Sequence, residues 1–161
     1  EPFVRHVGEH AAIVGLASAH PNPVHKSSGR VPDAQLASLR RLITSDALAG
    51  RFVFVALHYA PRLWNGKPDS ALHGLENDGA LLDAVRSLAF GAVVFGHVHH
   101  NYVTRVDGVA PPLVGAGSAT YAEREGAWLW ELGSETATAT RLVYERDTWR
   151  PLAAGQLTMR R

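Results

Sequence analysis

The sequence predicts an α/β protein in which a β-α-β-α-β unit runs into an antiparallel β-meander. Three apolar segments of strand length, residues 11–18, 51–57 and 91–95, alternate with two amphipathic helical patterns. This order is typical of a mostly parallel sheet. After residue 100 the segments become short and several alternate apolar with polar residues, which favours antiparallel strands. We therefore expect one packed unit, 1–161, with an α/β part over 11–100 and a β-meander over 101–152.

Composition and charge narrow the class of protein. The chain has 161 residues, of which 46% are hydrophobic, enough for the core of one domain. Its net charge of +1 provides no basic field, so we expect no nucleic-acid partner. The longest apolar run, residues 88–95, is too short to cross a bilayer, and no signal peptide is visible, so we expect no membrane partner. The absence of cysteine excludes a disulfide framework and a thiolate metal site, and fits a cytoplasmic location.

The first predicted strand is the apolar run AAIVGLAS at residues 11–18. A loop rich in proline, glycine and serine follows over 19–32, and Asp33 then stands where a helix cap is expected. Leucine and isoleucine recur at helical spacing over 36–43. No strand is evident before residue 11, so we expect the first strand to present an unpaired apolar edge to which a partner docks.

The second and third predicted strands frame a second helix. Residues 51–57, RFVFVAL, are apolar almost throughout, as expected of a strand covered on both faces. A long loop occupies 58–76, and Asn77 or Asp78 can cap the second helix. The segment GAVVF at 91–95 is the third buried strand.

The remaining segments predict the meander. The candidate strands are NYVTRV, PLVGAG, AWLWEL and TATATRLVYE, with TWRPL as a weaker candidate. Turn residues separate them at Asp107-Gly108 and Gly133-Ser134. We expect the final residues, QLTMRR, to form a loose end.

Histidines follow two of the predicted strands at their carboxyl ends. In VVFGHVHH, residues 93–100, His97 and His99 share one side if the segment is extended, and His100 faces elsewhere. His58 directly follows the second strand. Carboxyl ends of neighbouring parallel strands meet at one edge of a sheet, and imidazole suits divalent transition metals. The sequence therefore predicts a metal site of His58, His97 and His99; the alternative is that these histidines only line turns.

The loop over residues 58–76 is expected to wall one side of this site. Arg62 is a candidate phosphate ligand because guanidinium matches phosphate bidentately, although an exposed loop arginine is an equal interpretation. His73 is a second candidate for substrate binding, since its loop follows His58 and can reach over the site. Trp64 can stack on a base or sugar, or pack under the loop.

The chain has a strand that ends at His58, then a helix, then a strand that ends in GHVH at residues 96–99. This order resembles the last two motifs of the calcineurin-like metallophosphoesterases. GLENDGALLDAVRSLAFGAVVFGHVHH and GLASAHP…SGRVPDAQLASLRRLI are similar to the same family, so the resemblance covers about residues 11–120. It implies a two-layer β-sandwich flanked by helices and a centre of two transition metals, Mn, Fe or Zn. It also implies that His58 and His97 bind one metal and His99 the other, and that a hydroxide held by both metals attacks phosphorus.

The first three motifs of that family are absent from this chain. No glycine is followed by aspartate or asparagine, and no aspartate is followed two residues later by histidine. The tripeptide GEH at 8–10 lacks the asparagine of the third motif. Those motifs supply the bridging carboxylate and the proton donor, so we expect no catalytic residue in this chain and no activity from it alone.

Two hypotheses account for a chain with only the late motifs. In the first, the chain is the carboxyl-terminal part of a metal-dependent phosphoesterase acting on a small phosphate ester, more favourably a diester. Its amino-terminal half, or another chain, would then complete the site. The start at Glu1 rather than methionine favours this hypothesis. In the second, the chain is a catalytically degenerate relative that serves as a binding or assembly module.

Overall fold

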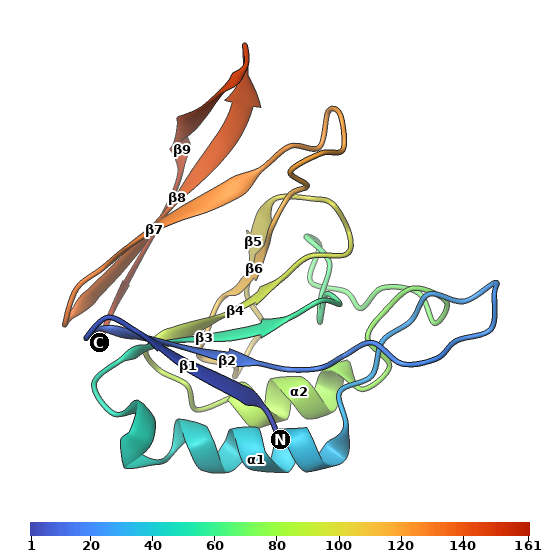
Figure 1. Cartoon of the computed structure of the whole chain (residues 1–161), viewed down its shortest axis with the longest axis vertical. Helices are drawn as coiled ribbons and strands as arrows, with labels where there is room; N and C mark the ends of the chain where they lie inside the picture. The colour runs from blue at the N-terminus through green and yellow to red at the C-terminus, as the bar shows by residue number, and fades with distance from the viewer.

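The computed structural model describes residues 1–161, apart from the side chain of residue 153. The strands form two sheets, one of six strands in the order β1-β2-β3-β4-β6-β5 and one of three in the order β7-β8-β9. Figure 1 shows α1 and α2 on one side of the first sheet and the second sheet on its other side. This layered α/β architecture confirms the predicted fold class. The elements are β1 (Phe3–Val7), β2 (Ala11–Gly15), α1 (Asp33–Ile43), η1 (Asp46–Leu48), β3 (Phe52–Leu57), α2 (Asp78–Val85), β4 (Gly91–Phe95), β5 (Tyr102–Thr104), β6 (Leu113–Gly115), β7 (Ala127–Leu132), β8 (Thr136–Glu145) and β9 (Thr148–Arg160).

The centre of the first sheet is parallel, as the alternation of strands and helices predicts. β2, β3 and β4 are hydrogen-bonded neighbours that run in one direction, and β6 continues this parallel set beside β4. Their side chains pack against the apolar faces of α1 and α2 in the larger core, in which Val14, Val55 and Val93 are fully buried. The parallel register places the carboxyl ends of β3 and β4 side by side.

Strand β1 corrects the expectation of an unpaired edge on residues 11–18. Phe3–Val7 pairs antiparallel with β2 along its whole length, and Gly8, with a φ of +56°, makes the turn between them. All five residues of β1 are exposed, so no apolar run marked this strand in the sequence. The edge strand at this end of the sheet is therefore β1, on which the Phe3 side chain is 59% exposed.

Strands β5 and β6 belong to the first sheet rather than to the meander. They pair with each other antiparallel, and the connection between them contains Gly108 with a φ of +72°. β6, however, lies parallel to β4, so the expectation that all strands after residue 100 are antiparallel is wrong. The order of strands along the sheet, β4-β6-β5, shows that the chain crosses over before it returns.

The second sheet packs on the face of the first sheet that lies opposite the helices. Its buried residues Ala137 and Met159 join Phe52 and Phe90 in a second core. Met159 pairs with Ala137 in the β8–β9 ladder, so the expectation that residues 156–161 are a loose end is wrong. Figure 1 shows the far end of the β8–β9 hairpin projecting beyond the body of the molecule.

Helix length and hydropathy give one further result. Among the described residues, no helix combines the length and the apolar character needed to cross a membrane.

Candidate functional site

His58 and His97 meet at the carboxyl edge of the first sheet. β3 ends at Leu57 and β4 at Phe95, which are register partners, so the residues that follow each strand are neighbours. The backbone N–H of Gly96 donates to the His58 carbonyl at 3.1 Å. The side chains also meet, with His97 Nδ1 lying 3.2 Å from His58 Nε2. Two imidazole nitrogens therefore converge at one point, which is the position that the strand-end argument predicts.

The segment that carries His97 and His99 is not extended. His97 has a φ of +65° and His99 a φ of +49°, so both lie in the left-handed region. The expectation of two side chains alternating along an extended segment is therefore wrong. Left-handed non-glycine residues cost roughly 1–3 kcal/mol each and concentrate at functional sites. The two imidazoles have different ring neighbours, Tyr59 for His97 and Tyr121 for His99.

Tyr59 holds the imidazole of His97 from one side. Its ring centroid lies 4.4 Å from that of His97 and 5.0 Å from that of His58. Tyr59 is 7% exposed, and its ring lies against Gly29, where a Cβ would stand 2.1 Å from the ring. Sequence reasoning missed this contact because no pattern links residue 29 to residue 59.

Burial lowers the pKa of the His97 imidazole, and the neighbouring His58 lowers it further. The charge of Asp69 acts in the opposite direction, and His73 acts both ways, through its backbone and through its ring. The loop over 58–76 therefore brings Asp69 and His73 close to His97. A contact between His73 and substrate stays a prediction. A lowered pKa keeps His97 neutral at physiological pH, the state in which imidazole binds metals.

His99 and His100 pack against aromatic side chains instead of joining the pair. The His99 ring lies 5.5 Å from that of Tyr121, and the His100 ring lies 5.1 Å from that of Trp64. Within the part of the chain that the structure describes, no three His, Cys, Asp or Glu residues are close enough together to hold a metal ion. The structure thus brings together two of the three predicted ligands, and a metal contact of His99 stays a prediction.

Arg62 is engaged by its own chain. Its guanidinium forms an ion pair with Asp78, at the start of α2, and donates to the Pro61 carbonyl at 2.7 Å. The Tyr102 hydroxyl donates to the Arg62 carbonyl at 2.6 Å. Burial lowers the pKa of Arg62 and raises that of Tyr102. These contacts anchor the start of the loop over 58–76, and phosphate binding by Arg62 stays a prediction.

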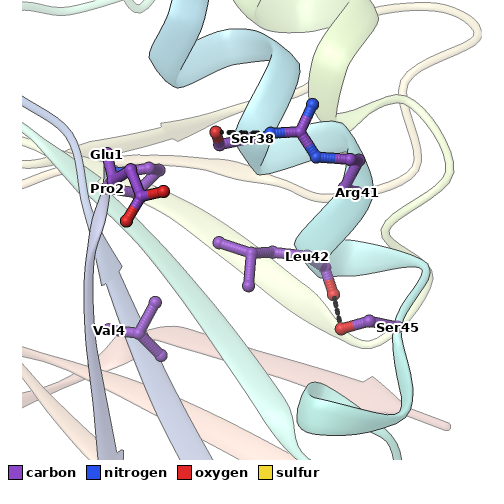
Figure 2. A pocket seen from close by; sticks show the side chains of 7 residues that line it. All are labelled: Glu1, Pro2, Val4, Ser38, Arg41, Leu42 and Ser45. Atoms are coloured by element: carbon purple, nitrogen blue, oxygen red, sulfur yellow. Dashed lines mark hydrogen bonds between the residues drawn. The ribbon is translucent and has the colours of Figure 1, made fainter.

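Two surface cavities lie near the amino terminus. One, of about 490 Å³, borders His58 between the carboxyl ends of β2 and β3 and is also lined by Gly15, Leu16 and Ala56. The other, of about 320 Å³, lies between β1 and α1, and Figure 2 shows its lining, with Arg41 turned to Ser38. In the second cavity, the Arg41 guanidinium already donates to Ser38, and no histidine is among the lining residues. The cavity that borders His58 is therefore the one that belongs to the histidine site.

Comparison with solved structures supports a phosphatase-like fold. A dimetal phosphatase from Danio rerio aligns with a TM-score of 0.59 at 13% identity, over 80% of this chain and 38% of that one. Wild-type Vps29 complexed with Zn²⁺, from Entamoeba histolytica, aligns over 91% of this chain and 98% of that one at 14% identity, with a TM-score of 0.37. At that score the second likeness carries no argument. No family model and no curated protein matches the sequence.

The class that these results define is a fold like that of a dimetal phosphatase. At 13% identity the likeness to the dimetal phosphatase shows the fold alone, and this fold is compatible with the one that the resemblance in the motifs implies. This chain spans about two fifths of the length of the phosphatase, 38%.

Proposed function

We propose that this chain is the carboxyl-terminal part of a metal-dependent phosphoric ester hydrolase that acts on a small phosphate ester. The observation that carries the proposal is the pair of imidazole nitrogens of His58 and His97, 3.2 Å apart at the carboxyl edge of parallel strands. Ligands of open α/β sheets bind at this edge. The fold shared with a dimetal phosphatase supports the same chemistry.

The two imidazoles fit part of a transition-metal site. Neutral imidazole is a preferred ligand of Zn and Fe, and both nitrogens here point to one place. His99, on the same turn, is the proposed ligand of a second metal. A bound metal pair would supply positive charge to the phosphate oxygens and would lower the pKa of a water molecule. Mn, Fe and Zn are the proposed metals.

In the proposed reaction, the residues of this chain bind the metals and orient the metal ligands. His58 and His97 supply nitrogen ligands, and Tyr59 fixes the orientation of the His97 ring. The cavity beside His58 leaves room for carboxylate ligands from an amino-terminal half or from another chain. General acid catalysis is typically worth about a hundredfold to ten-thousandfold, and no family proton donor is present, so we expect the chain alone to be inactive.

The substrate proposal rests on charge and on the loop over 58–76. A net charge of +1 fits a small ester better than a long polyanion. Trp64 is 56% exposed beside His100, which favours a substrate with a planar group, and a diester over a monoester. The absence of cysteine is compatible with a cytoplasmic location for this chemistry.

One observation favours the second candidate, a degenerate binding or assembly module. β1 pairs with β2 and so occupies the edge at which an absent half was expected to dock. The incomplete ligand set among the described residues fits this candidate as well. The two candidates differ in whether the histidine pair binds metal.

Metal titration by calorimetry tests the proposal on the wild type, His97→Ala and the control His25→Ala, which changes an exposed loop histidine. We expect Mn²⁺ and Zn²⁺ to bind the wild type and the control alike. His97→Ala should bind at least about tenfold more weakly, because even the loss of a group that orients a metal ligand costs about that much. Equal binding by all three proteins would overturn the proposal. A second test uses a longer polypeptide that includes this chain. If it hydrolyses an aryl phosphodiester and His97→Ala abolishes that activity, the binding or assembly module is excluded.

A further inference from the structure

The loop over residues 116–126 crosses from the first sheet to the second, where it joins β6 to β7 (Figure 1). β6 runs parallel to β4, and its last residue, Gly115, is the register partner of Phe95 at the end of β4. The loop therefore begins at the same edge of the sheet as the turn that carries His97 and His99. The two segments meet at Tyr121, whose ring centroid lies 5.5 Å from that of His99.

Backbone contacts close this loop at its base. The Ser118 N–H donates to the Arg124 carbonyl at 2.9 Å, and the Gly126 N–H donates to the Ser118 carbonyl at 3.1 Å. The Ser118 hydroxyl also accepts from the Tyr121 N–H at 3.0 Å. The two arms touch, since a Cβ at Gly117 would stand 2.7 Å from the Gly126 Cα. The tip of the loop, residues 119–124, is exposed throughout.

A tight turn at the tip brings Arg124 over the ring of Tyr121. The Arg124 N–H donates to the Tyr121 carbonyl at 3.0 Å, and Glu123, inside this turn, has a φ of +66°. Left-handed backbone is unfavourable for a residue other than glycine, and such residues concentrate at functional sites. The turn leaves Arg124 Cζ 5.5 Å from the Tyr121 ring centroid. One aromatic ring therefore separates the guanidinium from His99.

The Arg124 guanidinium keeps its hydrogen-bond donors available. Arg124 is exposed, and among the side chains that the structure describes no carboxylate forms an ion pair with it, although Glu123 and Glu125 flank it in the chain. A guanidinium that lies over an aromatic ring interacts through its face, so the N–H groups at its edge are free for another acceptor. Arg62, by contrast, is already paired with Asp78.

We infer that Arg124, rather than Arg62, binds the phosphate group of the substrate. The inference rests on the proposed function, because it takes the histidine site as the place where that phosphate lies. Guanidinium N–H groups donate in pairs to two non-bridging phosphate oxygens, which free phosphate and phosphate esters both present. A diester keeps two such oxygens and one negative charge, which a single guanidinium matches. Tyr121 is a positioning residue, since it lies between Arg124 and His99 and supports the guanidinium.

The test is a titration of the zinc-loaded chain with inorganic phosphate and with dimethyl phosphate at constant ionic strength, followed by phosphorus NMR. We expect the wild type to bind both, and Arg124→Met to bind both at least about tenfold more weakly. Arg150→Met, which removes an exposed arginine of β9, should bind as the wild type does. Tyr121→Phe keeps an aromatic ring and should retain binding, whereas Tyr121→Leu should bind about twofold to fivefold more weakly.

Metal titration of the same variants separates this inference from the proposed function. Arg124→Met should bind Zn²⁺ as the wild type does, because Arg124 is not a proposed metal ligand. Retained phosphate binding in Arg124→Met, an equal loss in Arg150→Met, or no phosphate binding by the wild type with or without zinc would overturn the inference. If the wild type binds no zinc but binds phosphate through Arg124 in chelator-treated buffer, the proposed function fails and the phosphate contact of Arg124 stands.

Discussion

Substitution of Gly29 by alanine tests the contact that supports the histidine pair. The added Cβ would stand 2.1 Å from Cδ2 and 2.5 Å from Cγ of the buried Tyr59 ring, where ordinary contacts begin at 3.4 Å. The ring would have to move by roughly 1 Å or more, and it has little room because it packs on His97. Overpacking of this kind costs about 1–3 kcal/mol. For a chain of this length that lowers the unfolding temperature by about 2–12 °C.

Urea and thermal unfolding of Gly29→Ala would measure this loss, with Gly79→Ala as the matched control. A Cβ at Gly79 meets nothing within 4 Å and lies in the first turn of α2, so that variant should be unchanged or more stable by up to about 1 kcal/mol. In a Tyr59→Leu background, Gly29→Ala should cost less, with a coupling energy of about 0.5–3 kcal/mol. A neutral Gly29→Ala, or an equal cost in both backgrounds, would refute the steric reasoning.

Three further predictions follow from polar contacts. The hydrogen bond from Lys26 holds the pKa of Glu76 below its ordinary value of 4.5. The stabilisation is therefore complete above that value and declines as pH falls through the lowered pKa; urea titrations across this range should show a weaker acid dependence in Glu76→Gln, and an unchanged slope would contradict the assignment. Arg62→Met removes a half-buried ion pair and should cost about 1.5–3 kcal/mol, whereas Arg30→Met, from an exposed pair, should cost at most about 1 kcal/mol; equal losses in denaturant would count against the anchoring role. Tyr102→Phe removes the hydrogen bond to the loop over 58–76 and should cost about 1 kcal/mol, with proteolysis of that loop increasing; an unaltered cleavage rate would speak against this anchor.

The buried elements of the fold could be predicted from the sequence. Continuous apolar runs predict strands covered on both faces, and β2, β3 and β4 are such strands. Helical spacing predicts α1 and α2 equally well. The pattern is readable in these cases because burial requires it.

The exposed and irregular elements could not be predicted in this way. β1 has no buried residue, so its pairing with β2 depends on backbone hydrogen bonds that any sequence supplies. In residues 156–159 of β9, exposed side chains alternate with partly buried or buried ones, and this short pattern ends at Met159. These residues are ordered because they pair with β8, which the local sequence does not reveal. The parallel pairing of β6 with β4 depends on a crossover that leaves no local signal.

The sequence by itself determined that His58 and His97 lie together, because each follows a buried strand and the ends of neighbouring parallel strands coincide. The tertiary structure decided what surrounds them. Three features depend on tertiary structure because the residue types involved occur in many other arrangements. They are the left-handed turn at His97 and His99, the Gly29–Tyr59 contact and the ion pair of Arg62. Periodicity records which side chains are buried, whereas contacts between distant loops depend on how whole elements pack.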